Sequence, residues 1–176
     1  MARKYTGNTD GDNGGPREGT QELFRLASKR WGFTNLGIYA NRRMNNFQAA
    51  AEPDNPKFLS VHATGRAVDL GYSNRAAALA FWNFLIANTE QLGIEEIHDY
   101  SYRNPRQSPN DKLAWGAGYR CSRGPGMAGI RIFDSKNNAG TPGGRWIHVE
   151  LSPEMADNKE AFRKAWIDAL KRAGLK

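Results

Sequence analysis

The chain has 176 residues, of which 39% are hydrophobic and 11% aromatic, and this suits one globular domain with a substantial core. Its 25 basic and 18 acidic residues give a net charge of +7, which favours polyanionic partners such as anionic cell-wall polymers, membrane surfaces or nucleic acid. No apolar run approaches the roughly 20 residues that span a bilayer, and no zinc-finger, RNA-recognition or homeodomain pattern is present, so we expect neither membrane insertion nor a nucleic-acid partner.

The N-terminal stretch is rich in Gly, Asn and Asp between residues 6 and 19. This composition predicts a flexible, irregular arm over residues 1–19, followed by a single domain over residues 20–176. The first residues are basic but no apolar stretch follows them, so we expect no secretory signal. Cys121 is the only cysteine, which excludes an internal disulfide bond and a multi-cysteine zinc site.

Hydrophobic periodicity alternates between the helical and the strand pattern along the rest of the chain. The expected elements are, in chain order, a helix over residues 20–31, a strand over 34–43, a loop over 44–58, a strand over 66–71, a helix over 74–92, a strand over 94–102, a loop-rich insertion over 103–143 with one short strand at 129–133, a strand over 145–152 and a final helix.

The final helix has two signals of its own. Asp157 with Glu160 resembles a capping box. An apolar stripe at helical spacing follows, made of Phe162, Trp166, Leu170 and Ala173. Together, these elements predict a mixed α+β domain in which helices cover a small sheet.

The stretch SVHATGRAVDLG holds a histidine and an aspartate seven positions apart. If the second half is a strand, Val68 and Leu70 point into the core, while Ala67 and Asp69 share the opposite face. Gly65 permits the tight or positive-φ backbone that the turn into this strand requires. The small side chain of Ala67 keeps the face beside Asp69 open, as a substrate site requires.

The later stretch RWIHVELS shows the same alternation, with Ile147 and Val149 on the buried face and His148 on the other. If the two strands are near neighbours, His62, Asp69 and His148 can converge. Two imidazoles and one carboxylate are suitable zinc ligands, and three protein ligands leave a fourth position for water, as in catalytic sites. On these residues alone, a surface histidine beside an ordinary strand aspartate stays the alternative.

The exact residues of the first stretch are more specific than their alternation, because SVHATGRAVD resembles the pattern S-x-H-x-x-G-x-A-x-D. That pattern is the signature of the zinc D-alanyl-D-alanine peptidase superfamily, which includes D-Ala-D-Ala and lysostaphin-type metallopeptidases and the hedgehog signalling domain. WIHVEL is similar to the family's W/F-x-H-x-D/E strand, which bears the third ligand, and the order of the elements also agrees. The segments YTGNTDG and HATGRAVDL resemble segments of the peptidase domains of mycobacteriophage-type endolysins.

The resemblance implies a hedgehog/DD-peptidase-like fold, with a small antiparallel sheet flanked by helices. It makes His62, Asp69 and His148 the ligands of one Zn²⁺ per chain. It also implies hydrolysis of peptide bonds in peptidoglycan stem peptides. Such a phage protein would be made in the host cytoplasm and act at the bacterial cell wall after release, or be carried on the virion with other phage proteins.

The resemblance also suggests residues that contact substrate. Ser60 and an early arginine, here Arg42 or Arg43, would lie near the substrate carboxylate, for which a guanidinium is suited. For the arginines, a solvated face is the alternative.

One departure from the family concerns the general base. Many members have a Glu, Asp or His shortly before the last ligand, where this chain has Arg145 and Trp146. Glu150 is our first candidate for the base, because it lies two residues beyond His148 on the same strand face. An orienting partner of His148, or a salt bridge, is the alternative role for Glu150. The remaining candidates for the base are His98 and Asp134.

Two function classes follow from these observations. The first is a zinc peptidase acting on peptidoglycan. The second, which the missing upstream acid keeps open, is a non-hydrolytic zinc-containing module that binds peptidoglycan or a protein. A purely structural phage protein is a third possibility.

Overall fold

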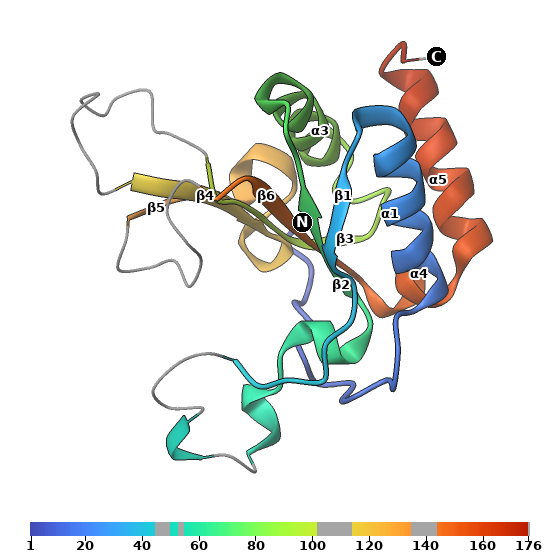
Figure 1. Cartoon of the computed structure of the whole chain (residues 1–176). Helices are drawn as coiled ribbons and strands as arrows, with labels where there is room; N and C mark the ends of the chain where they lie inside the picture. Colours follow the sequence, from blue (N-terminus) through green and yellow to red (C-terminus); the bar gives the residue numbers. More distant parts are fainter. Residues whose placement is uncertain (45–49, 53–54, 102–113, 135–143, 176) are drawn as a thin grey trace.

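The structure is a computed structural model that describes residues 1–44, 50–52, 55–101, 114–134 and 144–175. Six strands form one antiparallel sheet in the order β1–β2–β6–β3–β4–β5. The expected α+β class with an antiparallel sheet is confirmed (Figure 1). The strands are β1 (Thr34–Gly37), β2 (Ala67–Gly71), β3 (Ile94–Asp99), β4 (Ala114–Arg120), β5 (Ile130–Asp134) and β6 (Trp146–Leu151).

Helices pack on the sheet face that carries its apolar side chains, and α1 lies beside α4 and α5 (Figure 1). Val68 and Leu70 of β2 and Ile147 and Val149 of β6 are fully buried there, as their alternation predicts. No helix of the described residues is long and apolar enough to cross a membrane. The helices are α1 (Glu18–Trp31), α3 (Arg75–Ala87), α4 (Pro153–Asp157) and α5 (Lys159–Arg172).

Aromatic rings join three of these helices. Trp31 of α1 lies 5.3 Å from Phe84 of α3 and 5.8 Å from Trp166 of α5, measured between ring centroids. Phe84 and Trp166 are themselves 4.9 Å apart in an edge-to-face arrangement, which is favourable for aromatic pairs. This cluster fixes the helices over one face of the sheet and leaves the other face for polar groups.

The predicted strand over residues 34–43 is wrong in its second half, since β1 ends at Gly37. β1 is an edge strand, and Leu36 is 59% exposed rather than in the core. Beyond it, Tyr39 and Asn41 donate hydrogen bonds to the carboxylate of Asp12 in the N-terminal arm. These bonds hold the chain away from the sheet.

Two further elements are shorter than predicted. The helix expected over residues 74–92 ends at Ala87, because Asn88 caps it by donating from its side chain to the carbonyl of Phe84 at 2.8 Å. The strand expected over residues 94–102 ends at Asp99, whose carboxylate accepts a hydrogen bond from the amide of Ser101. Such local side-chain bonds compete with regular structure.

The loop-rich insertion holds more strand than predicted. β5 agrees with the expected short strand, but β4 was not expected, because its glycines conceal the alternation in AWGAGYR. The parts of the insertion at residues 102–113 and 135–143 lie outside the described residues.

The predicted capping box of the last helix is also wrong. Asn158, not Asp157, caps α5 by accepting from the amide of Ala161, and Asp157 pairs with Arg17. Phe162 and Trp166 are buried as predicted, and Leu170 is partly buried against the core. Ala169 is also buried, whereas Ala173 is exposed.

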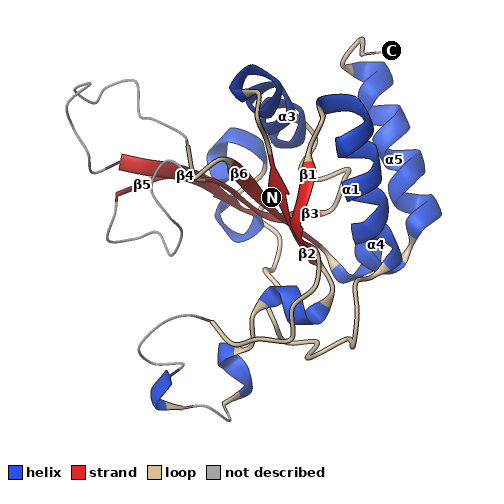
Figure 2. Cartoon of the chain, in the orientation of Figure 1, coloured by secondary structure: helices blue, strands red, loops and turns tan. Residues whose placement is uncertain are grey.

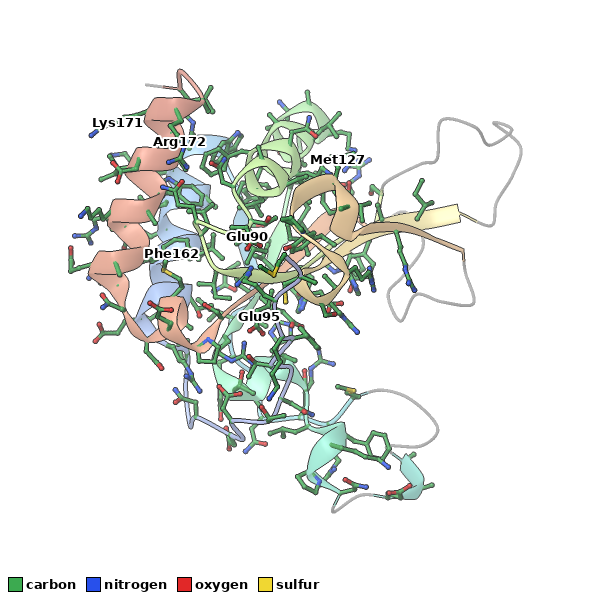
Figure 3. The ribbon with its side chains drawn as sticks, turned by 180° about the vertical axis from the view of Figure 1, so that it is seen from behind. Glu90, Glu95, Met127, Phe162, Lys171 and Arg172 are labelled. Carbon is green, nitrogen blue, oxygen red and sulfur yellow. The ribbon has the colours of Figure 1, made fainter. Side chains whose placement is uncertain are left out.

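The N-terminal arm has no helix or strand before α1 begins at Glu18 (Figure 2). Hydrogen bonds nevertheless join it to the domain along its length. The fully buried Arg66 donates to the backbone carbonyl of Gly7 and forms a 2.9 Å ion pair with Asp10. Thr6 donates to Glu95 at 2.7 Å, and Arg3 pairs with Glu90 at 3.1 Å. Seen from behind, Glu90 and Glu95 both lie where the arm passes (Figure 3). These contacts pack residues of the N-terminal arm against the domain.

Candidate metal centre

Strand pairing places three polar side chains in a row. β2 pairs with β6 in a register that sets Asp69 directly opposite His148. On its other side β6 pairs with β3, which sets His98 opposite His148. Directly opposite residues of neighbouring strands share one face of the sheet. The row therefore lies on the face away from the helices.

The second histidine of the predicted site precedes β2 in a short 3₁₀ helix, η2 (Val61–Thr64). Ser60 caps this helix, with its Oγ accepting a hydrogen bond from the amide of His62 at 3.3 Å. Gly65 ends it with a φ of 72°, a left-handed conformation that glycine adopts without a steric penalty. The predicted role of Gly65 is confirmed, and the turn leaves His62 buried beside β2.

His62, Asp69 and His148 converge, and their ligand atoms all lie within 4.8 Å of one another. Nε2 of His62 is 3.3 Å from Oδ2 of Asp69, and Nδ1 of His148 is 2.8 Å from Oδ1. In a tetrahedral zinc site, bonds of about 2.0–2.1 Å place neighbouring ligand atoms about 3.3 Å apart. The three side chains could therefore hold one metal ion.

The surroundings of His148 favour a positive charge. Burial lowers the pKa of His148, but its hydrogen bonds to Asp69 and Glu150 raise that pKa by more, to about 10. Burial raises the pKa of Asp69, but hydrogen bonds from His148 and His62 hold it below its usual range. The carboxylates that hold a proton on His148 would equally attract a metal cation to this place.

Glu150 is buried, and both of its carboxylate oxygens are engaged. Oε1 lies 3.0 Å from Nε2 of His148, and Oε2 accepts a hydrogen bond of 2.8 Å from the hydroxyl of Tyr5. Since Nδ1 of His148 faces Asp69, Glu150 contacts the imidazole through its other nitrogen. A carboxylate in this position orients a metal-ligating histidine and fixes its tautomer.

A second row of polar residues runs beside the first. In it Glu150 of β6 is opposite Glu96 of β3, which is opposite Arg120 of β4. Glu96 lies 2.6 Å from Nε2 of His98 and 2.7 Å from Nη2 of Arg120. Burial raises the pKa of Glu96, but the hydrogen bond with His98 and the nearby positive charges lower it to about 2. Glu96 therefore holds His98 beside the candidate ligands.

The predicted substrate residues lie in different settings. Ser60 is buried as the cap of η2, and its amide bonds to the carbonyl of Arg42 at 2.9 Å. The side chain of Arg42 is exposed. The side chain of Arg43 instead donates to the carbonyl of Asn55 at 2.6 Å.

The positions before the last ligand offer no carboxylate. Arg145 is exposed, and the Trp146 ring lies 4.6 Å from the Tyr100 ring. Asp134 is the last residue of β5, and its side chain lies outside the described part of the structure.

Sequence reasoning missed Tyr5, Glu96 and Tyr100, which all lie around the candidate ligands. Strand alternation about His98 could have found Glu96 and Tyr100, because residues two positions apart share a face. No local signal could have found Tyr5, because its position depends on how the irregular arm crosses the domain.

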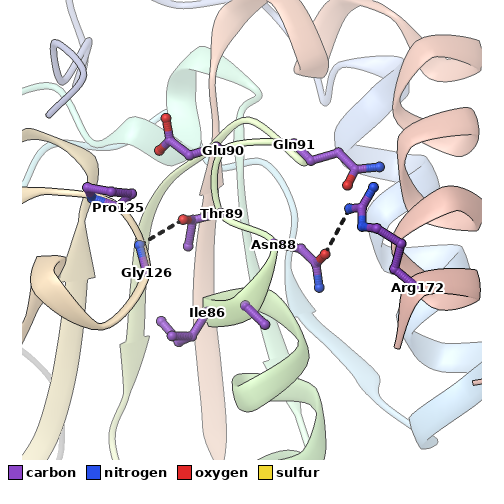
Figure 4. A pocket seen from close by; sticks show the side chains of 9 residues that line it. Ile86, Asn88, Thr89, Glu90, Gln91, Pro125, Gly126 and Arg172 are labelled. Atoms are coloured by element: carbon purple, nitrogen blue, oxygen red, sulfur yellow. Dashed lines mark hydrogen bonds between the residues drawn. The ribbon is translucent and has the colours of Figure 1, made fainter. Parts of the chain in front are cut away.

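A cavity of about 340 Å³ lies elsewhere, between the end of α3, the turn that follows it and the C-terminal part of α5 (Figure 4). Asn88, Thr89, Gln91, Gly126 and Arg172 are among its lining residues. None of the predicted site residues lines it, and its walls are already joined by hydrogen bonds from Arg172 to Asn88 and from Gly126 to Thr89.

Comparison of the chain with protein-family models, with curated proteins and with solved structures gave no match in any of the three.

Proposed function

We propose that the chain is a zinc-dependent peptidase of bacterial peptidoglycan, with a hedgehog/DD-peptidase-like fold. The observation that carries the proposal is the convergence of His62, Asp69 and His148 on one face of the sheet. The match of SVHATGRAVD and WIHVEL to the motifs of the zinc D-Ala-D-Ala peptidase superfamily supports it.

In this proposal Nε2 of His62, a carboxylate oxygen of Asp69 and Nδ1 of His148 hold one Zn²⁺. When bound, the ion would supply a Lewis acid and a water of lowered pKa. Burial of His62, with its Nε2 directed at Asp69, restricts the imidazole to one orientation.

The role of Glu150 in the proposal is to orient His148, because both carboxylate oxygens are already bonded. The proton-accepting role then falls to His98. Its Nε2 is 2.6 Å from Glu96, and its ring centroid is 6.0 Å from that of His148. An imidazole whose Nε2 donates to a carboxylate has its lone pair on Nδ1, and in His98 that nitrogen lies 3.4 Å from the hydroxyl of Tyr100.

The substrate in the proposal is a peptidoglycan stem peptide, with Arg42 as the group that meets a substrate carboxylate. Arg42 is exposed, and its backbone carbonyl accepts a hydrogen bond from Ser60, two residues before His62. The net charge of +7 suits attraction to anionic cell-wall polymers. We place the protein in a phage, acting on the wall after release or from the virion.

A second candidate is a zinc-containing module that binds peptidoglycan without cleaving it. Arg145 and Trp146 occupy the positions where related enzymes carry a catalytic acid or histidine. In addition, both oxygens of Glu150 are engaged. These two features are the observations that support the second candidate.

Digestion of purified peptidoglycan separates the two candidates. Zinc-loaded protein is incubated with insoluble peptidoglycan between about pH 6 and 9, and newly exposed amines and released fragments are identified by mass spectrometry. A peptidase produces new amines that disappear on chelation and in the His62→Ala variant. Zinc-loaded protein that sediments with peptidoglycan but exposes no amine would instead be the binding module.

A further inference from the structure

Tyr5 joins the N-terminal arm to the polar face of the sheet at one defined place. Its hydroxyl donates a 2.8 Å hydrogen bond to Oε2 of Glu150, which is 145 residues away in the chain. The guanidinium of Arg120 lies over its ring, 4.4 Å from the centroid. Arg120 also bonds Glu96. Both the ring and the hydroxyl of Tyr5 therefore contact the row of Glu150, Glu96 and Arg120, which runs beside the candidate metal ligands.

The arm does not depend on the Tyr5 hydroxyl for its place. Thr6 donates to Glu95 through both its amide and its hydroxyl. Arg66 binds Gly7 and Asp10 just beyond. Removal of the Tyr5 hydroxyl alone should therefore leave the arm docked. It should remove only the hydrogen bond that Glu150 accepts from Tyr5.

Glu150 connects the Tyr5 hydroxyl to the candidate metal ligand His148. It is 4% exposed, so few water molecules can replace a lost hydrogen-bond donor. Its other oxygen lies 3.0 Å from Nε2 of His148. A carboxylate fixed at both oxygens holds the imidazole in one orientation, and such outer partners of a ligand histidine typically change metal affinity by about 10–100-fold.

We propose that Tyr5 is a positioning residue of the metal site, which makes the N-terminal arm a component of that site. The hydroxyl of Tyr5 fixes Glu150, and Glu150 fixes His148 for zinc. This inference rests on the proposed function, because it requires that the site binds zinc.

The test compares Tyr5→Phe with Tyr39→Phe. Tyr39 also donates its hydroxyl to a carboxylate, that of Asp12 at 2.9 Å, so the two variants lose the same kind of bond. Zinc affinity is measured by titration calorimetry against a competing chelator, and the stability of the metal-free proteins by thermal unfolding. We expect Tyr5→Phe to bind zinc about tenfold more weakly and Tyr39→Phe to bind like the wild type. Metal-free Tyr5→Phe should unfold at a lower temperature than metal-free Tyr39→Phe, because the buried Glu150 loses a donor that water cannot replace, but it should stay folded at the temperature of the titration.

A double-mutant cycle checks the route through Glu150. In the Glu150→Ala background, Tyr5→Phe should have no further effect on zinc affinity. If wild type binds zinc and Tyr5→Phe binds it equally well, the inference is wrong and the metal site stands. A tenfold loss that persists in the Glu150→Ala background also contradicts it, because the effect then does not pass through Glu150. A wild-type chain that binds no zinc overturns the metal site itself, and the role of Tyr5 with it.

Discussion

Asp69 and His148 are directly opposite each other on neighbouring antiparallel strands, with Nδ1 of the imidazole 2.8 Å from Oδ1 of the carboxylate. This register brings together residues 79 positions apart in the chain. A slip of one residue would send His148 to the helix-covered face, because successive side chains alternate. The buried Ile147 and Val149 oppose such a slip, so the core fixes the register and the register forms the site.

The roles of Glu150 and His98 are separable by substitution. Glu150→Gln should weaken zinc binding about tenfold but keep most of the turnover when zinc is saturating. His98→Gln should keep its zinc and lose turnover about 100-fold, since general-base catalysis contributes that much or more. Initial rates of amine release at saturating zinc check both. The reverse pattern, with turnover lost in Glu150→Gln alone, would return the base role to Glu150.

Gly65 should not tolerate alanine. Its φ is 72°, and an added Cβ would lie 2.4 Å from the carbonyl oxygen of Gly15 in the arm. Gly32 is a matched control, with a φ of 74° and no atom within 4 Å of an added Cβ. We expect Gly32→Ala to lower the free energy of unfolding by about 1 kcal/mol, and Gly65→Ala by several times as much. Denaturant unfolding measures both, and equal losses would show that the arm does not pack against Gly65.

Glu22 should make stability depend on pH in the acid range. The hydrogen bond from Arg25 lowers its pKa most, burial raises it, and the bond from Arg163 lowers it again, to about 2. Because the pKa in the folded state is below the ordinary value of 4.5, the stabilisation is complete above about pH 4.5 and is lost as pH falls towards 2.

Glu22→Gln should therefore reduce the free energy of unfolding by about 1–3 kcal/mol at pH 7, with a difference that disappears towards pH 2. The control is Glu18→Gln, which alters an exposed carboxylate of the same helix. This variant should change the free energy of unfolding by less than about 1 kcal/mol. Denaturant unfolding at several pH values measures both, and a difference for Glu22→Gln that is independent of pH would contradict this prediction.

The sequence predicted the candidate ligands because alternation and glycine conformation are local. Val68 and Leu70 had to be buried, which left Asp69 on the other face, and Gly65 marked the turn after His62. The α+β class followed from the same periodicities.

Contacts between distant segments could not be predicted in the same way. Tyr5 reaches Glu150 because contacts with Arg66 and Glu95 hold the arm across the domain. The strand after Gly37 was predicted from its alternation, but bonds to Asp12 direct that segment elsewhere. The glycines of β4 interrupt its alternation of apolar and polar residues, which is the pattern that identifies a strand in a sequence.

Zinc content measured by mass spectrometry on the purified, folded chain tests the central claim most directly. We predict one zinc per chain in the wild type, and loss of that zinc in His62→Ala and in His148→Ala. His98→Ala changes a histidine on the same face outside the ligand group and should retain it. A folded wild-type chain that takes up no zinc, or one whose zinc survives loss of both His62 and His148, would contradict the metal site and the function proposed from it.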